Sequence, residues 1–175
     1  VRNFDRKRWL VLKKMIDNNI NSPLTSSMGR LFDAAGSLIL GRERSEFEAE
    51  LPMELEKIAD KKERGHYKLF HRRGGTIIDM AGIIKGILSD LKINVPAPGI
   101  SAKFHNTIAY MVLKTAMRFD SKKIVLSGGV FQNKFLIQKA RELLDDHGFK
   151  VYTHSNIETN DSGIPIGQIA IADAR

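Results

Sequence analysis

Cysteine is absent from this sequence of 175 residues. Disulfide bonds, cysteine-rich zinc sites and thiolate chemistry are therefore excluded, and a reducing, cytoplasmic location is expected. No apolar run approaches the roughly 20 residues that a membrane-spanning helix needs, so we expect no membrane partner. Residues 1–14 are basic and lack the apolar core and cleavage site of a signal peptide. The missing initiator Met suggests a fragment or a shortened chain.

The composition, with 42% hydrophobic and 27% charged residues, predicts a buried core and a single domain over residues 1–175. The net charge of +8 favours phosphate, nucleic-acid or acidic partners. Few aromatic residues interrupt the densest basic cluster, so stacking on nucleic-acid bases is disfavoured without being excluded. This cluster comprises Lys61, Lys62, Arg64, Lys68, Arg72 and Arg73.

Helical spacing of apolar residues dominates the first two thirds of the chain. A hydroxyl side chain at Thr25, Ser26 or Ser27 is expected to cap the second helix. Pro52 is expected to start or kink the third. The expected elements are helices at about 6–18, 25–40, 46–61 and 79–91, a strand pair at 67–71 and 76–78 around Gly74-Gly75, a loop at 95–99, and a long helix opening at Ser101.

The last third of the chain predicts a parallel βαβ unit. Strands are expected at 123–127 and 149–153, with a helix at 131–146 between them and a final helix after 160–163. Ligands of such sheets bind at the carboxyl ends of the strands. Any site in this part of the chain should therefore lie at residues 127–133 and 160–163.

Gly128 and Gly129 follow the first of these strands, and Asn133 is expected in the first turn of the next helix. Two glycines allow close approach of a phosphate, and the helix N-terminus offers free N–H groups. The alternative is a tight turn that only packs. After the second strand, Asp161 is either a ligand of a phosphate-bound metal or, like Ser162, a cap of the final helix.

Gly29, Asp33 and Gly36 share one face of the second predicted helix. Each glycine inside a helix costs roughly 1 kcal/mol relative to alanine. A helix surface without side chains on either side of a carboxylate leaves room for a flat ligand. Asp33 would accept hydrogen bonds from the ribose hydroxyls of such a ligand. The alternative is close packing of two helices with Asp33 at the rim.

The five histidines form no metal-binding pair at helical spacing. His105 neighbours the inward-facing Phe104 and is expected to be a hydrogen-bonded core residue. His147 and His154 are expected at the surface. The sequence contains no arrangement sufficient for nucleophilic catalysis, so catalytic residues remain unassigned.

Five motifs, taken together, resemble the C-terminal part of the HypF family, carbamoyltransferases that mature nickel–iron hydrogenases. The resemblance covers about residues 22–172 and is most specific at 29–34 and 126–133. The motifs are Thr-Ser-Ser-Met-Gly-Arg-Leu-Phe-Asp-Ala at 25–34, Met-Glu-Leu-Glu at 53–56, Phe-His-Asn-Thr at 104–107, Leu-Ser-Gly-Gly-Val-Phe-Gln-Asn at 126–133, and Asn-Asp-Ser-Gly at 160–163 with Gly167-Gln168.

The resemblance implies an α/β fold, namely the C-terminal lobe of an actin-like (ribonuclease H-like) ATPase with a mixed sheet and several helices. It implies binding of ATP or carbamoyl adenylate, with a divalent metal such as Mg, Fe or Zn. It assigns nucleotide contacts to Gly128, Gly129 and Asn133, the adenosine end to Gly29, Asp33 and Gly36, and a metal ligand to Asp161.

The implied partners are a HypE-like protein, whose C-terminal cysteine accepts the carbamoyl group, or a missing N-terminal lobe. The family's metal-binding histidines belong to that lobe, so the chain is expected to be inactive alone. Two positions depart from the family: Ser162 replaces a second glycine, and Ala49 stands where glycine is common. The alternatives are a lobe of a tRNA threonylcarbamoyl transferase and a non-catalytic module that forms homodimers.

Overall fold

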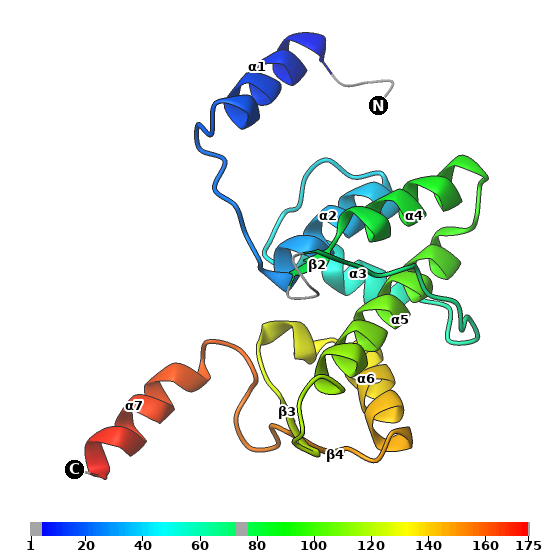
Figure 1. The fold of residues 1–175 in the computed structure, drawn as a ribbon. Coiled ribbons are helices and arrows are strands. Elements are labelled where there is room, and N and C mark those ends of the chain that lie inside the picture. The colour runs from blue at the N-terminus through cyan, green and yellow to red at the C-terminus, as the bar shows by residue number, and fades with distance from the viewer. Residues whose placement is uncertain (1–4, 73–76, 175) are drawn as a thin grey trace.

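A computed structural model describes residues 5–72 and 77–174 (Figure 1). The described residues form a mixed α/β structure in which helices predominate. The helices are α1 (Arg6–Asp17), α2 (Met28–Leu40), α3 (Glu50–Ile58), α4 (Ala81–Lys92), α5 (Ala97–Ala116), the 3-10 helix η1 (Gly129–Gln132), α6 (Lys134–Asp146) and α7 (Gly163–Asp173). The strands are β1 (Phe70–Arg72), β2 (Ile77–Asp79), β3 (Lys123–Leu126) and β4 (Lys150–Thr153).

The strands form two separate two-stranded sheets within the described part of the chain. β1 and β2 are antiparallel, whereas β3 and β4 are parallel, with Leu126 opposite Thr153. The connection between β3 and β4 contains α6, so the predicted βαβ unit is confirmed. The predicted turn at Gly74-Gly75 lies outside the described residues.

Helix α5 is the centre of the fold and runs between the upper helices and the β3–β4 unit in Figure 1. It contacts α2, α3, α4 and α6. Because neighbours surround it, its buried residues occupy most of its circumference rather than one stripe. Phe104 and Ile108 are almost fully buried there, and the ring of Phe32 from α2 meets Phe104 edge-on at 4.7 Å.

Three helix boundaries differ clearly from those expected, and other element ends are shifted by up to three residues. Helix α5 begins at Ala97, before Ser101, because proline is compatible with a first helical turn, and Pro98 stands there after the N-cap Pro96. Helix α3 begins only at Glu50. The predicted helix at 131–146 is divided into η1 and α6, with Asn133 between them.

Ala49 explains the late start of α3. It is the N-cap residue and has a φ of +62°, in the left-handed region that glycine enters without strain. Arg42 reinforces the same corner, because its guanidinium bonds Glu50 and Glu54 at 2.6 Å each.

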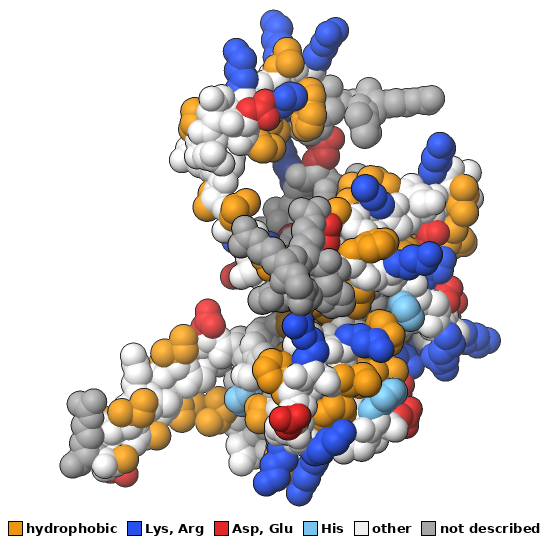
Figure 2. Space-filling view, viewed as in Figure 1, with side chains coloured by type: hydrophobic (Ala, Val, Ile, Leu, Met, Phe, Trp, Pro, Cys, Tyr) orange, Lys and Arg blue, Asp and Glu red, His pale blue; other side chains and the backbone are white. Residues whose placement is uncertain are grey.

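Helices α1 and α7 project away from the body at opposite ends of the chain (Figure 1). Neither helix has a buried residue. Figure 2 shows hydrophobic side chains distributed along α7. Its four isoleucines, Ile164, Ile166, Ile169 and Ile171, are 47–70% exposed. None of the helices in the described ranges combines the length and apolarity that crossing a bilayer requires.

Candidate nucleotide site

The loops that follow β3 and β4 lie against each other, as the parallel sheet predicts. The backbone N–H of Gly128 donates to the carbonyl of Thr159 at 3.0 Å. A Cβ placed on Gly129 would lie 3.9 Å from the Cβ of Asn160. Gly128 has a φ of +104°, which an L side chain rarely adopts. These glycines are exposed, so the edge formed by the two loops is open to a ligand.

Helix α2 approaches this edge from above and contacts η1 (Figure 1). Gly29, in its first turn, is exposed, and the Asp33 side chain is 40% exposed. Arg30 lies 3.6 Å from the Asp33 carboxylate, an ion pair that is open to solvent and therefore weak. Two of the three predicted adenosine contacts are thus accessible.

Gly36 differs from the other two residues of the predicted stripe. It is buried, and a Cβ at this position would lie 2.7 Å from the Cβ of Leu51. Such a distance requires the helices to shift, so Gly36 permits α2 and α3 to pack closely. The contact with Leu51 supports the alternative prediction, in which this glycine allows two helices to pack closely.

The sequence predicted Asn133 in the first turn of α6, but in the structure it is the N-cap residue that precedes this helix. Its Oδ1 accepts the backbone N–H of Leu136 at 2.8 Å, and its Nδ2 lies 2.9 Å from Nε2 of His105. Asparagine is a preferred N-cap residue because its side chain satisfies a free helix N–H group. Both ends of this amide are therefore engaged within the protein.

His105 fixes the side chain of Asn133 through a hydrogen bond. Its Nδ1 lies 2.8 Å from the carbonyl of Ser101, which can only accept, so Nδ1 carries the proton and Nε2 accepts from Asn133. The side chain is fully buried, with the rings of Phe32 and Phe135 at 5.3 and 5.2 Å. Burial lowers the pKa of His105 to about 4, so the imidazole is neutral at physiological pH. The predicted core histidine is confirmed.

A second contact occupies the N-terminus of α6. The N–H of Lys134 donates to Oε1 of Glu56 on α3 at 2.8 Å. With Asn133 bonding Leu136, two of the N–H groups expected to attract a phosphate are already satisfied. These two N–H groups at the start of α6 are therefore not free to bind an anion in this structure.

The structure adds one polar pair that the sequence did not predict. Nε2 of His154 lies 3.0 Å from Oγ of Ser127, and both side chains are exposed. These residues directly follow Leu126 and Thr153, which are opposite each other in the parallel register. The register of the predicted βαβ unit was the signal that could have revealed this pair.

Asp161 is exposed at the tip of the second loop. The turn there is made by Asn160, whose Oδ1 accepts from N–H and Oγ of Ser162 at 3.0 and 2.6 Å. Ser162 is the N-cap of α7 but makes no side-chain capping bond. Within residues 5–72 and 77–174, no three His, Cys, Asp or Glu side chains gather as metal ligands. The described residues alone therefore do not fit a complete metal site.

The amino-acid sequence matches a known protein family and is similar to curated members of it. Residues 1–168 match the family described as "Carbamoyltransferase, Kae1-like Domain, second subdomain". Carbamoyltransferase HypF of Synechocystis sp. is 31% identical over 153 residues, which are 85% of this chain and 19% of that protein. The HypF of Rhodobacter capsulatus is 30% identical over 164 residues, with coverage of 93% and 22%. The chain thus spans about a fifth of the length of these curated relatives.

Two solved structures have the same fold as this chain. Full-length HypF in the phosphate- and nucleotide-bound form superposes with a TM-score of 0.89 and 36% identity, over 99% of this chain and 24% of that one. HypF of T. kodakarensis shares the fold, with a TM-score of 0.79, 23% identity and coverage of 97% and 23%. The predicted α/β fold class is confirmed. The chain belongs to the HypF carbamoyltransferase family, in which it corresponds to the second subdomain of the Kae1-like domain.

Proposed function

We propose that this chain is the nucleotide-binding lobe of a HypF-type carbamoyltransferase. The observation that carries the proposal is the open edge where the Gly128-Gly129 loop is bonded to Thr159 and faces the start of α2. The phosphates of ATP or carbamoyl adenylate would lie over the two glycines and the first N–H groups of η1. Asp33 would accept hydrogen bonds from the ribose hydroxyls, beside the bare surface of Gly29.

The reaction we propose for the complete enzyme is transfer of a carbamoyl group to the C-terminal cysteine of a HypE-type acceptor. The S–H bond of the cysteine breaks and a bond forms between its sulfur and the carbamoyl carbon. The bond between that carbon and the phosphate oxygen breaks, so AMP leaves with the oxygen and the thiol proton is released. The role of this chain is to bind and orient the nucleotide portion. His105 acts indirectly, by fixing Asn133 and with it the turn between η1 and α6.

Asp161 is proposed as one ligand of a divalent cation, which would neutralise phosphate charge when bound. The described residues around it supply no second and third acidic or histidine ligand. The remaining ligands are therefore proposed to come from a complementary lobe.

Helix α7 supports the proposal of such a lobe. A helix that is apolar around its circumference is normally buried, yet its four isoleucines are 47–70% exposed. Its 11 residues are too few to span a bilayer, which needs roughly 20. Because α7 follows the Asp161 loop directly, burial of α7 against a second lobe would also fix that loop. Exposed apolar area of this kind equally permits homodimers.

Calorimetric titration with ATP and Mg²⁺ tests the half-site. Asp33→Ala removes the ribose acceptor and should weaken binding about tenfold or more, as expected for a bond to a charged group. Asp120→Ala removes an exposed carboxylate elsewhere and should leave affinity unchanged. Wild-type protein that binds no nucleotide at millimolar concentration would remove the basis of the proposal.

Gly129→Ala provides a second, sterically defined test. The added Cβ meets only ordinary van der Waals distance within the protein, at 3.9 Å, so the variant should fold normally. It should nevertheless weaken nucleotide binding, because the methyl group separates the backbone from the phosphate. Affinity equal to that of the wild type would place the phosphates elsewhere. Sedimentation equilibrium on the same samples separates monomers from the homodimer.

A further inference from the structure

Ser127 and His154 form a hydrogen-bonded pair where β3 and β4 end, and neither residue has a role in the nucleotide contacts proposed so far. Nε2 of His154 lies 3.0 Å from Oγ of Ser127, and both residues are exposed. Ser127 directly precedes Gly128, so their Cα atoms are about 3.8 Å apart. A phosphate that lies over the glycine loop is therefore within reach of this pair.

Several backbone N–H groups around this edge already have acceptors within the protein. The N–H of Gly128 donates to the carbonyl of Thr159 at 3.0 Å. At the start of α6, the N–H groups of Lys134 and Leu136 donate to side chains at 2.8 Å each. Side-chain donors therefore gain importance for any phosphate contact at this edge, and a hydroxyl and an imidazole are such donors.

His154 is also the only basic residue in the two segments that form the edge. These segments, residues 127–133 and 154–163, lie entirely within the described part of the chain and contain no lysine or arginine. They contain two carboxylates, Glu158 and Asp161, which repel a phosphate. An imidazole attracts a phosphate when it is protonated. Positive charge from these two loops can therefore come only from His154.

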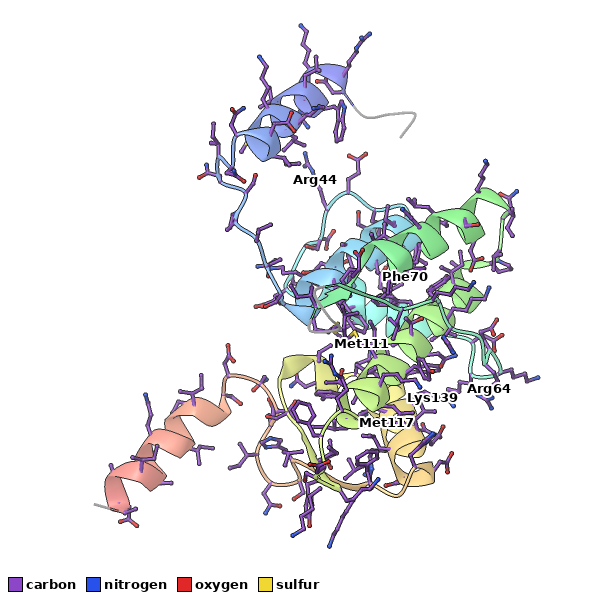
Figure 3. All side chains as sticks on the ribbon, viewed as in Figure 1. Arg44, Arg64, Phe70, Met111, Met117 and Lys139 are labelled. Atoms are coloured by element: carbon purple, nitrogen blue, oxygen red, sulfur yellow. The ribbon has the colours of Figure 1, made fainter. Side chains whose placement is uncertain are left out.

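Cations on neighbouring elements are directed elsewhere. Arg30 of α2 lies 3.6 Å from the carboxylate of Asp33. The side chain of Lys134 lines a groove between α3 and α6, on the α3 side of its helix. Figure 3 shows Arg64 and Lys139 on the right of the molecule, whereas the loop from β4 to α7 lies toward its left. His154 thus supplies a charge that these side chains do not duplicate.

We propose that His154 and Ser127 recognise the α-phosphate of the bound nucleotide, and so distinguish phosphorylated adenosine from adenosine itself. This inference rests on the proposed nucleotide site. The imidazole donates to a phosphate oxygen and, when protonated, balances part of its charge. The hydroxyl of Ser127 can accept from the imidazole while it donates to the same phosphate. AMP, ATP and carbamoyl adenylate share this phosphate, so the pair contributes to the binding of all three.

Titration of the chain with AMP and with adenosine separates phosphate recognition from a general effect on the site. His154→Ala should weaken AMP binding about tenfold, as expected for a hydrogen bond to a charged group, and change adenosine affinity less than about twofold. His154→Arg retains a cationic donor and should bind AMP within about threefold of the wild type. Ser127→Ala should weaken AMP binding about threefold.

His147→Ala is the matched control. His147 is also exposed, and its Nδ1 lies 2.8 Å from a single partner, the carbonyl of Leu143. It follows the last residue of α6, a helix of 13 residues, and is therefore roughly 20 Å from the end that adjoins the glycine loop. This variant should bind AMP and adenosine as the wild type does.

NMR titration gives a direct readout of the contact. The imidazole signal of His154, identified by its loss in His154→Ala, should shift on addition of AMP and remain in place with adenosine. Inorganic phosphate at the same concentration should shift it less than AMP, because the adenosine portion anchors the phosphate. A shift as large with inorganic phosphate as with AMP would overturn the assignment to the nucleotide.

Asp33→Ala keeps this test separate from the test of the site as a whole. If Asp33→Ala weakens binding of both ligands while His154→Ala binds AMP like the wild type, only the phosphate assignment is overturned. Equal losses of AMP and adenosine affinity in His154→Ala also overturn it, because a merely structural role would produce them. Wild-type protein that binds neither ligand at millimolar concentration overturns both the nucleotide site and this assignment.

Discussion

Replacement of His105 by glutamine should remove most of the acid sensitivity that this buried network gives the protein. His105 is fully buried and neutral, with its pKa lowered from 6.5 to about 4 by burial. The unfolded chain therefore binds more protons than the folded chain between about pH 4 and 6.5. This contribution to stability is complete above pH 6.5 and decreases as the pH falls toward 4.

The magnitude follows from the same two values. The gap between 6.5 and about 4, at about 1.4 kcal/mol per pH unit, corresponds to about 3 kcal/mol. Glutamine has no titratable group, so the variant lacks this term. The free energy of unfolding of the wild type should therefore fall by about 2–3 kcal/mol more than that of the variant between pH 7 and 4.5.

Urea denaturation of both proteins at several pH values measures this difference. Lys85→Gln, at an exposed site on α4, should retain the wild-type dependence on pH. Nitrogen NMR of the imidazole of His105 should show the proton on Nδ1, as the bond to Ser101 requires. Parallel pH curves for the wild type and His105→Gln would refute the reasoning.

Two further predictions concern the packing of α2 and α3. Gly36→Ala should lower the free energy of unfolding by about 1–2 kcal/mol, because overpacking against Leu51 outweighs the gain in helix propensity; thermal unfolding that shows no loss would contradict the contact. Ala49→Gly should raise stability by about 1 kcal/mol, because glycine adopts the φ of +62° without strain; a lower midpoint in urea would argue against strain at this residue.

Local chemistry made several elements predictable. Ser27 caps α2 and Gly41 ends it with a φ of +66°, as their residue types indicate. The parallel register of β3 and β4 follows from two short apolar strands separated by a helix. These features depend on residues close together in the chain, so the sequence contains the information needed to predict them.

Long-range packing decided the functions of individual site residues. Asn133 has the same sequence context whether it binds a ligand or caps a helix, and only contact with His105, 28 residues earlier, reveals its second bond. Gly36 shares a helix face with Gly29, yet α3 covers only Gly36. His154 reaches Ser127 because the sheet register places the strand ends side by side.

The sequence by itself determined the family, the βαβ unit and the position of the candidate site at residues 127–133 and 160–163. Helix periodicity, caps and glycine motifs specify these features locally. Only the tertiary structure decided which polar groups stay available to a ligand, because availability depends on hydrogen bonds between distant segments.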